Sequence, residues 1–457
     1  MVKDLSRGFV LSATVAVLGA QAGYAQETQE RGSELRFGLS IETRAEENAS
    51  LSRPAESATH SIENRVTVGY SRRTATSTFD IGGGISGFVG HDPSGDFTEF
   101  RSPNAYLTYE KQGKDSRFRA TTRADTSEID SLVTVVDPDT GELSLTADPG
   151  RRTTVNQTVS LSLMEGGPLE LDFGASSGAV RYEDTLSSSY YDSDRASGKI
   201  DARFKLSPNA TLSTGVAFSG YEADNADSTI RENRSATVGL DMRLDSQTEA
   251  SFGVGYTEVE TWNSGQSDLQ EGGTFSAGVT RSTETRKIGL NYDHSIAATG
   301  ARDSLTAAYE QSYTLSRISA ELGYAMDDNG DGGWIGSVDY FHELQTGDIK
   351  LSLSRDITTS DNNQDRFTTQ VSADWRHTLN ETSSVAVRVV YAEVEYLTAD
   401  IATTGRGQIS ASYSQQINRD WNVTAGVGQR RAIQTGLDDA VSNFVFVRLN
   451  REFSIRP

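Results

Sequence analysis

The chain has 457 residues, of which 35% are hydrophobic, with 42 glycines, 8 prolines and no cysteine. That apolar share is low for a soluble globular domain, where about 45–50% is usual, and the mean hydropathy is −0.48. After the first 25 residues no apolar run is long enough for a membrane helix, so a helical membrane protein is excluded. The formal charge of −22 disfavours nucleic acid as a partner, because phosphate binding needs clustered Lys and Arg. A disordered acidic chain and a β protein with one apolar face remain.

The first segment has the pattern of a secretory signal peptide. Lys3 and Arg7 form a basic start, residues 9–20 are apolar, and small residues surround Ala25. We expect cleavage after Ala25, with the site after Ala22 as the second choice, and a short periplasmic segment over 26–33. The chain is then exported, and without cysteine no disulfide stabilises it.

From residue 34 onward the sequence alternates apolar and polar residues. In the first run Leu35, Phe37, Leu39 and Ile41 occupy every second position, and similar runs recur up to 445–453. A period of two predicts strands with one apolar face, and a disordered segment would not keep this phase. We expect about 22 strands of about 10–14 residues, with 18 to 22 as the range for their number.

The gaps between these runs alternate between short and long. Short gaps such as 112–115, 165–168 and 207–209 predict tight turns. Longer gaps predict loops at 45–59, 89–99, 127–150, 183–193, 222–230, 263–270, 357–364 and 434–440. Tight turns at one end and loops at the other are typical of outer-membrane barrels.

The apolar face of such strands could be buried in a soluble sandwich or could contact lipid. The expected strand length suits a tilted membrane span, and a closed sheet leaves no unpaired edge in hydrocarbon. The four tryptophans sort by height, with Trp262 and Trp334 at the loop end and Trp375 and Trp421 at the turn end. This is the arrangement of an aromatic girdle, and it favours lipid.

With these features the chain resembles Gram-negative outer-membrane β-barrel proteins, of the porin-like or polysaccharide-export type. The final strand 445–453 is similar to the signal read by the barrel-assembly machinery, although four residues follow Phe453. The resemblance implies an all-β fold: a single closed antiparallel transmembrane β-barrel over 34–457. It also implies contact with outer-membrane lipid and lipopolysaccharide, short periplasmic turns and long acidic external loops.

The polar phase of the strands predicts which side chains line the lumen. These pore-lining candidates are Arg117, Arg119, Arg123, Arg203, Lys205, Asp241 and Arg243. The longest expected loop, 127–150, carries a second set of candidates: Asp130, Asp137, Asp139 and Glu142. It is similar in position and charge to the loop that narrows general diffusion porins, but its alternation equally fits a projecting hairpin. Acidic loops would attract cations, or they would simply keep the surface solvated.

Motifs for other chemistry are weak. The stretch 82–87 fits GxGxxG and 174–178 fits GxSxG, but each lies within an expected strand with no helix after it. Asp327 opens a stretch that resembles a calcium loop, yet Val338 stands where that loop needs Glu. The five histidines show no ligand spacing. We therefore expect no enzymatic activity, no cofactor and no metal, with calcium at 327–332 left open.

Three hypotheses remain. The first is a channel for passive diffusion or export of a hydrophilic solute, such as a polysaccharide. We expect no segment ahead of the barrel to act as a plug, which argues against an energy-coupled siderophore transporter. The second is a non-conducting structural or surface-interaction barrel that acts through its external loops. The third is a soluble secreted β protein.

Overall fold

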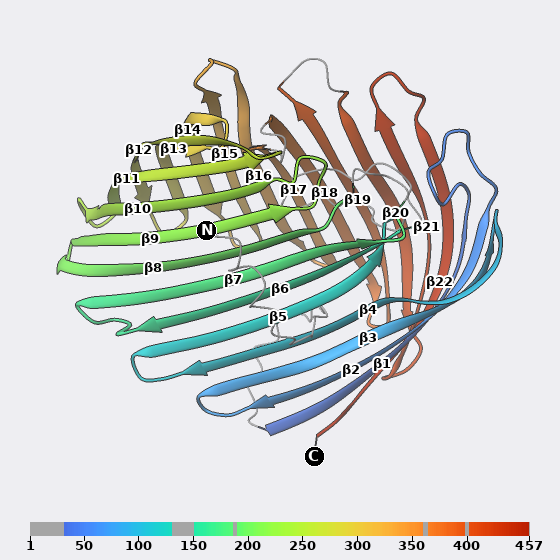
Figure 1. The fold of residues 1–457 in the computed structure, drawn as a ribbon. Helices are drawn as coiled ribbons and strands as arrows, with labels where there is room; N and C mark the ends of the chain where they lie inside the picture. Colours follow the sequence, from blue (N-terminus) through green and yellow to red (C-terminus); the bar gives the residue numbers. More distant parts are fainter. Residues whose placement is uncertain (1–31, 130–149, 186–189, 360–363, 398–401, 457) are drawn as a thin grey trace.

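The computed structural model describes residues 32–129, 150–185, 190–359, 364–397 and 402–456. These residues form one sheet of 22 strands, in which each strand pairs with the next along the chain. The last strand pairs antiparallel with the first, so the sheet closes into a barrel (Figure 1). The predicted all-β antiparallel barrel is confirmed, with a strand number inside the expected range. No helix long and apolar enough to cross a membrane occurs among the described residues.

The strands are longer than expected, from 12 to 18 residues. Their bounds are β1 Gly32–Glu46, β2 Thr59–Arg73, β3 Ser77–Asp92, β4 Gly95–Gln112, β5 Ser116–Glu128, β6 Arg151–Leu163, β7 Leu169–Glu183, β8 Ser193–Ser207, β9 Ala210–Ala223, β10 Ile230–Arg243, β11 Thr248–Asn263, β12 Gln266–Ser282, β13 Arg286–Ala297, β14 Gly300–Ser312, β15 Ser316–Asp327, β16 Gly332–Leu344, β17 Gly347–Thr359, β18 Asp365–Asn380, β19 Ser383–Tyr396, β20 Thr404–Gln416, β21 Trp421–Gln434 and β22 Ala440–Ile455.

The apolar phase of the strands lies on the outside of the barrel and the polar phase on the inside. The register of the strands keeps apolar residues next to one another on the same face. For example, Phe37 of β1 faces Val68 of β2 and Phe453 of β22. Outward side chains such as Val254 remain 57% exposed, because a wall one strand thick has no second layer against its outer face. This arrangement explains the low apolar share of the sequence.

The closing strand extends past the expected end at Phe453. β22 runs to Ile455, which faces Leu35 of β1, so Ser454 and Ile455 belong to the barrel wall. The rings of Phe37 and Phe453 stack with centroids 5.2 Å apart across this seam.

Two of the expected long loops are tight hairpins. Only residues 93–94 join β3 to β4, and only residues 264–265 join β11 to β12. At the first of these tips, one carboxylate oxygen of Asp92 accepts the backbone N–H groups of Ser94 and Gly95 at 2.8 and 3.0 Å, which turns the chain at once. Polar residues that the sequence analysis assigned to loops therefore continue the hydrogen-bonded pairing of the strands beyond their apolar part. The connection 47–58 is a true loop, as expected.

Candidate functional site: the inner wall and its mouth

Oppositely charged side chains pair between neighbouring strands on the inner wall. Lys205 Nζ of β8 lies 2.7 Å from Glu170 Oε1 of β7, and Arg203 Nη2 lies 3.0 Å from Asp172 Oδ2 on the same two strands. Further round, Arg317 of β15 lies 2.8 Å from Glu310 of β14. Such pairs hold the long side chains against the wall and reduce the net field that a solute would meet.

All seven pore-lining candidates occupy the inward phase of their strands. On β5, Arg119 faces Glu110 of β4, and Arg117 and Arg123 share its phase. On β10, Asp241 faces Ser251 of β11 in the phase opposite to the outward Leu240. Several of these cations already have carboxylate neighbours; Arg117 Nε lies 3.8 Å from Glu165, and Arg243 Nε lies 3.5 Å from Glu249. The candidates from β5, β8 and β10 therefore share one face without forming a single cluster.

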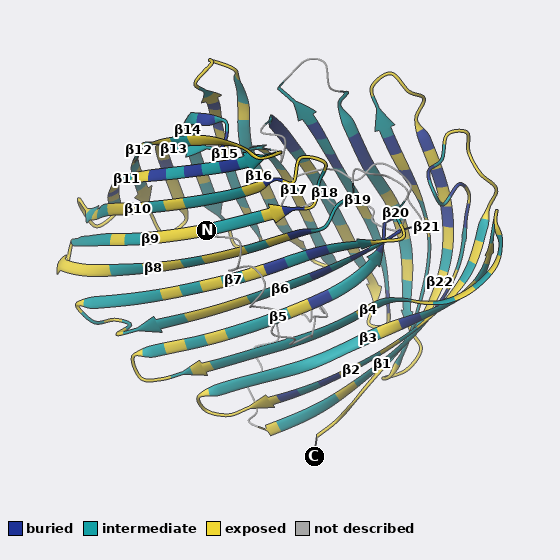
Figure 2. Cartoon of the chain, viewed as in Figure 1, coloured by how far each residue is buried: buried dark blue, intermediate teal, exposed yellow. Residues whose placement is uncertain are grey.

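Buried residues gather toward the loop ends of the strands (Figure 2). They include charged side chains of the inner phase, namely Glu42, Glu46, Arg152, Arg366, Arg406 and Arg430. Two described segments cover part of this end of the barrel.

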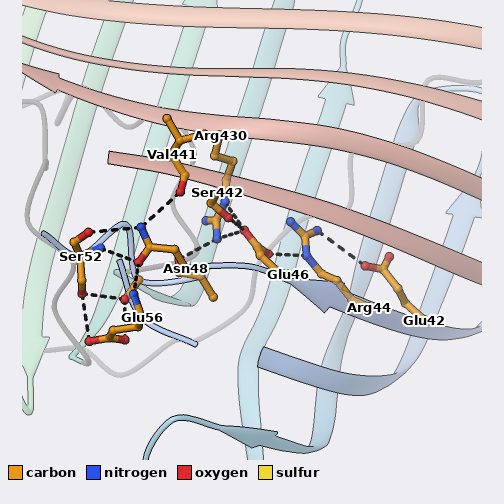
Figure 3. Close-up of polar contacts among 11 residues, drawn as sticks. Glu42, Arg44, Glu46, Asn48, Ser52, Glu56, Arg430, Val441 and Ser442 are labelled. Atoms are coloured by element: carbon orange, nitrogen blue, oxygen red, sulfur yellow. Dashed lines mark hydrogen bonds and ion pairs between the residues drawn. The ribbon is translucent and has the colours of Figure 1, made fainter. Parts of the chain in front are cut away.

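The first segment is loop 47–58, which lies on the inner face of β21 and β22 (Figure 3). Just before it, Glu46 forms an ion pair with Arg430 of β21, and both side chains are only 6% exposed. Arg430 Nε donates to Glu46 Oε1 at 2.6 Å, and the Ser442 hydroxyl donates to the same oxygen at 2.6 Å. Arg430 also donates to the carbonyl of Ala49 at 2.8 Å, which ties the start of the loop to the wall.

Asn48 organises the rest of this loop. Its amide nitrogen donates to the Val441 carbonyl of β22, and its Oδ1 accepts the backbone N–H groups of Ser52 and Glu56 at 3.0 and 3.1 Å. Asn48 has a φ of 48°, a left-handed conformation that Asn tolerates better than most residues. Leu51 then packs on the inner-wall residues Ala432 and Ala440. A polar hub and an apolar anchor thus fix the loop against the inner wall.

The second segment is the loop end of the β17–β18 hairpin. The ladder between β16 and β17 stops at Gly336 and Arg355, so the last residues of β17 pair with β18 alone. The Phe367 ring of β18 lies against Gly333 of β16, where a Cβ would come within 2.6 Å of it. Asp365 lies 2.8 Å from Arg302 Nη2 on the inner face of β14. The hairpin end therefore leans over the inner wall of β14–β16.

The constriction candidates Asp130, Asp137, Asp139 and Glu142 lie outside the described residues. The described contacts at the mouth come from Glu46, Asn48 and Arg430, which the sequence reasoning did not single out. One signal was present: Glu42, Arg44 and Glu46 continue the inward phase of β1 beyond its apolar residues.

The four tryptophans lie toward the ends of their strands. Trp262 and Trp334 are near the loop ends of β11 and β16, whereas Trp375 and Trp421 are toward the turn ends of β18 and β21. Trp334 is 64% exposed.

In the turn that resembled a calcium loop, Asp327 Oδ1 accepts the backbone N–H groups of Asn329 and Asp331. No group of three or more potential metal ligands occurs among the described residues.

No family model and no curated protein matches this chain. Its fold is similar to solved outer-membrane structures. The FrpB iron transporter from Neisseria meningitidis (F5-1 variant) has a TM-score of 0.59 and 11% identity, covering 93% of this chain and 83% of that chain. The ferric-catecholate import receptor Fiu from E. coli K12 has a TM-score of 0.59 and 10% identity, covering 93% of this chain and 82% of that chain. The copper transporter OprC has a TM-score of 0.55 and 9% identity, covering 93% of this chain and 81% of that chain. At such low identity the likeness is one of fold: a 22-strand barrel of the kind seen in these transport proteins.

Proposed function

We propose that this protein is a transport barrel of the Gram-negative outer membrane that carries a hydrophilic solute. One observation carries the proposal: a closed sheet is apolar and half-exposed outside, while its inside is lined by polar and charged side chains. Hydrocarbon accepts a sheet only when every edge is paired, and a polar interior suits a hydrated cargo. The solved barrels of similar fold support a transport role.

Within this proposal, the seven inward candidates of β5, β8 and β10 line the path, and loop 47–58 narrows its mouth. The signal peptide over 1–25, which lies outside the described residues, would direct export. Lipopolysaccharide and lipid would contact the outer face, and the barrel-assembly machinery would read β22.

The covered mouth favours a second candidate, a barrel that acts through its external loops without conducting. Loop 47–58 and the β17–β18 hairpin end both lie over the inner wall. In this candidate the two segments would close the mouth, and passage would need the release of either one.

Conductance distinguishes the two candidates. The refolded full chain is inserted into planar bilayers, and liposome swelling is measured with neutral sugars of increasing size. Stable ion conductance and solute entry are expected. A barrel that shows heat-modifiable migration, and is therefore folded, but conducts no ion and admits no solute would exclude passive transport and favour the second candidate. For metal-chelate uptake, as in the proteins of similar fold, the separate assay is growth on a ferric or copper chelate as sole metal source.

A further inference from the structure

A groove lies in the inner wall where β22, β1, β2, β3 and β4 meet. Its volume is about 830 Å³, within the range typical of small-molecule sites. The lining is charged and polar on the inward phase, and it includes Arg36, Arg65, Asp80 and Tyr106. It lies toward the turn ends of these strands, away from loop 47–58.

Tyr106 and Gly69 line the floor of this groove, and Gly82 packs against the tyrosine ring. In register, Arg36 of β1 faces Gly69 of β2, Gly69 faces Gly82 of β3, and Gly82 faces Tyr106 of β4. A Cβ on Gly82 would come within 2.7 Å of Tyr106 Cε1, and one on Gly69 within 3.2 Å of the Tyr106 hydroxyl. The tyrosine ring therefore lies flat across two strands, in space that side chains on both glycines would otherwise occupy.

Close packing accounts for two glycines of the stretch 82–87, which no nucleotide-binding context explained. Gly82 admits the ring, and Gly84, one inward position along, would place a Cβ 2.8 Å from Thr67 Cγ2. A ring held flat on the wall turns its other face to the lumen, because Tyr106 also lines the groove.

The polar groups beside the ring are held loosely. Arg36 Nη2 lies 4.0 Å from Asp80 Oδ1, and Arg36 Nε lies 3.9 Å from Glu34 Oε2, both beyond hydrogen-bond range. The Arg36 side chain is 48% exposed. Elsewhere on the inner wall the pairs of Lys205 and Arg317 close to less than 3 Å. Donors of Arg36 and acceptors of Asp80 thus remain available to a ligand next to the aromatic face.

We propose that this groove is a binding subsite for a neutral saccharide, with one sugar ring stacked on Tyr106. A sugar ring offers an apolar face of C–H groups to an aromatic ring and a rim of hydroxyls that both donate and accept. The guanidinium and carboxylate groups of the lining, which are present in near-equal numbers, can hydrogen-bond to these hydroxyls without favouring a charged ligand. The subsite deepens the proposed transport function and rests on it, since only a lumen that admits solutes would expose this groove to its ligand.

The test measures binding and conductance separately on the refolded full chain. Calorimetry in detergent uses a panel of neutral oligosaccharides with α-1,4, β-1,4 and β-1,3 linkages, together with an acidic oligogalacturonate. Binding of at least one neutral member is expected. Tyr106→Ala should weaken it by about tenfold or more, whereas Tyr106→Phe, which keeps the ring, should stay within about threefold. Tyr109→Ala is the matched control, because Tyr109 lies on the same strand in the outward phase and contacts Phe118 there.

Each outcome decides the proposal. Binding that requires Tyr106 and not Tyr109 supports the subsite. No binding by any neutral member, binding of the acidic probe alone, or equal affinity in Tyr106→Ala and the wild type overturns it. In planar bilayers, a conducting barrel whose current no sugar interrupts would leave the transport function standing without the subsite. Saccharide binding by a barrel that never conducts would leave the subsite standing without the transport function.

Discussion

Replacing Arg430 with alanine should release loop 47–58 from the inner wall. The Arg430–Glu46 pair is buried, with both side chains 6% exposed, and Arg430 also holds the Ala49 carbonyl. Removing one partner of a buried ion pair costs about 3–5 kcal/mol, because the other charge stays buried without compensation. The remaining strands keep their ladders, so most of this cost falls on the opening of the loop rather than on the whole barrel.

Hydrogen exchange followed by mass spectrometry measures that opening directly. A loss of about 3 kcal/mol or more corresponds to exchange at least about a hundredfold faster in the backbone amides of 47–58. Cleavage after Glu56 by a glutamate-specific protease should accelerate in parallel, and bilayer conductance should rise if the loop narrows the path. Arg431→Ala is the matched control: this neighbour faces outward, is 54% exposed and pairs with Asp439 at the surface. Such a pair contributes about 0–1 kcal/mol, so little change is expected.

The reasoning is refuted if exchange across 47–58 in Arg430→Ala stays within about threefold of the wild type while the barrel remains folded. A uniform acceleration over all strands would also contradict it, because the change would then be global. The double variant with Glu46→Ala should be less damaged than the sum of the two single variants, since it leaves neither charge unpaired.

Three further predictions concern other parts of the barrel. Asp365→Ala removes the carboxylate that lies 2.8 Å from Arg302, so the β17–β18 hairpin end should exchange faster, and unaltered protection over 356–369 would contradict its attachment. Phe453→Ala removes the ring stacked on Phe37 at the closing seam, which should cost about 1 kcal/mol and lower the temperature at which the detergent-gel mobility changes; an unchanged temperature would argue against that contribution. In the turn between β10 and β11, the Gln247 backbone N–H and then the Thr248 side chain hold the pKa of Asp245 below its usual value. The turn should therefore be fully stabilised above the ordinary aspartate pKa and loosen as pH falls through the lowered one, which a carboxyl NMR titration would follow; a titration at the ordinary value would refute it.

The faces of the strands can be predicted from the sequence, because alternation of apolar and polar residues is a local property. The period of two placed Leu35, Phe37 and Leu39 on one face, and strict phase over the chain predicted a closed antiparallel barrel with the right number of strands. The candidates from β5, β8 and β10 were assigned to the inward phase for the same reason. The ends of the strands were less predictable. The polar tips of β3 and β4 have the composition of a loop, although the two strands stay paired there.

The sequence by itself determined the fold class and the two faces of the wall, since each depends on spacing along one strand. Only the tertiary structure decided what covers the mouth and what lies in the groove. Glu46 and Arg430 are far apart in the sequence and meet because β1, β22 and β21 are neighbours at the closing seam. Tyr106 crosses Gly82 and Gly69 because three strands fall into one register. Such contacts depend on the pairing of strands and on the direction of individual side chains, and no periodicity within a single strand records either.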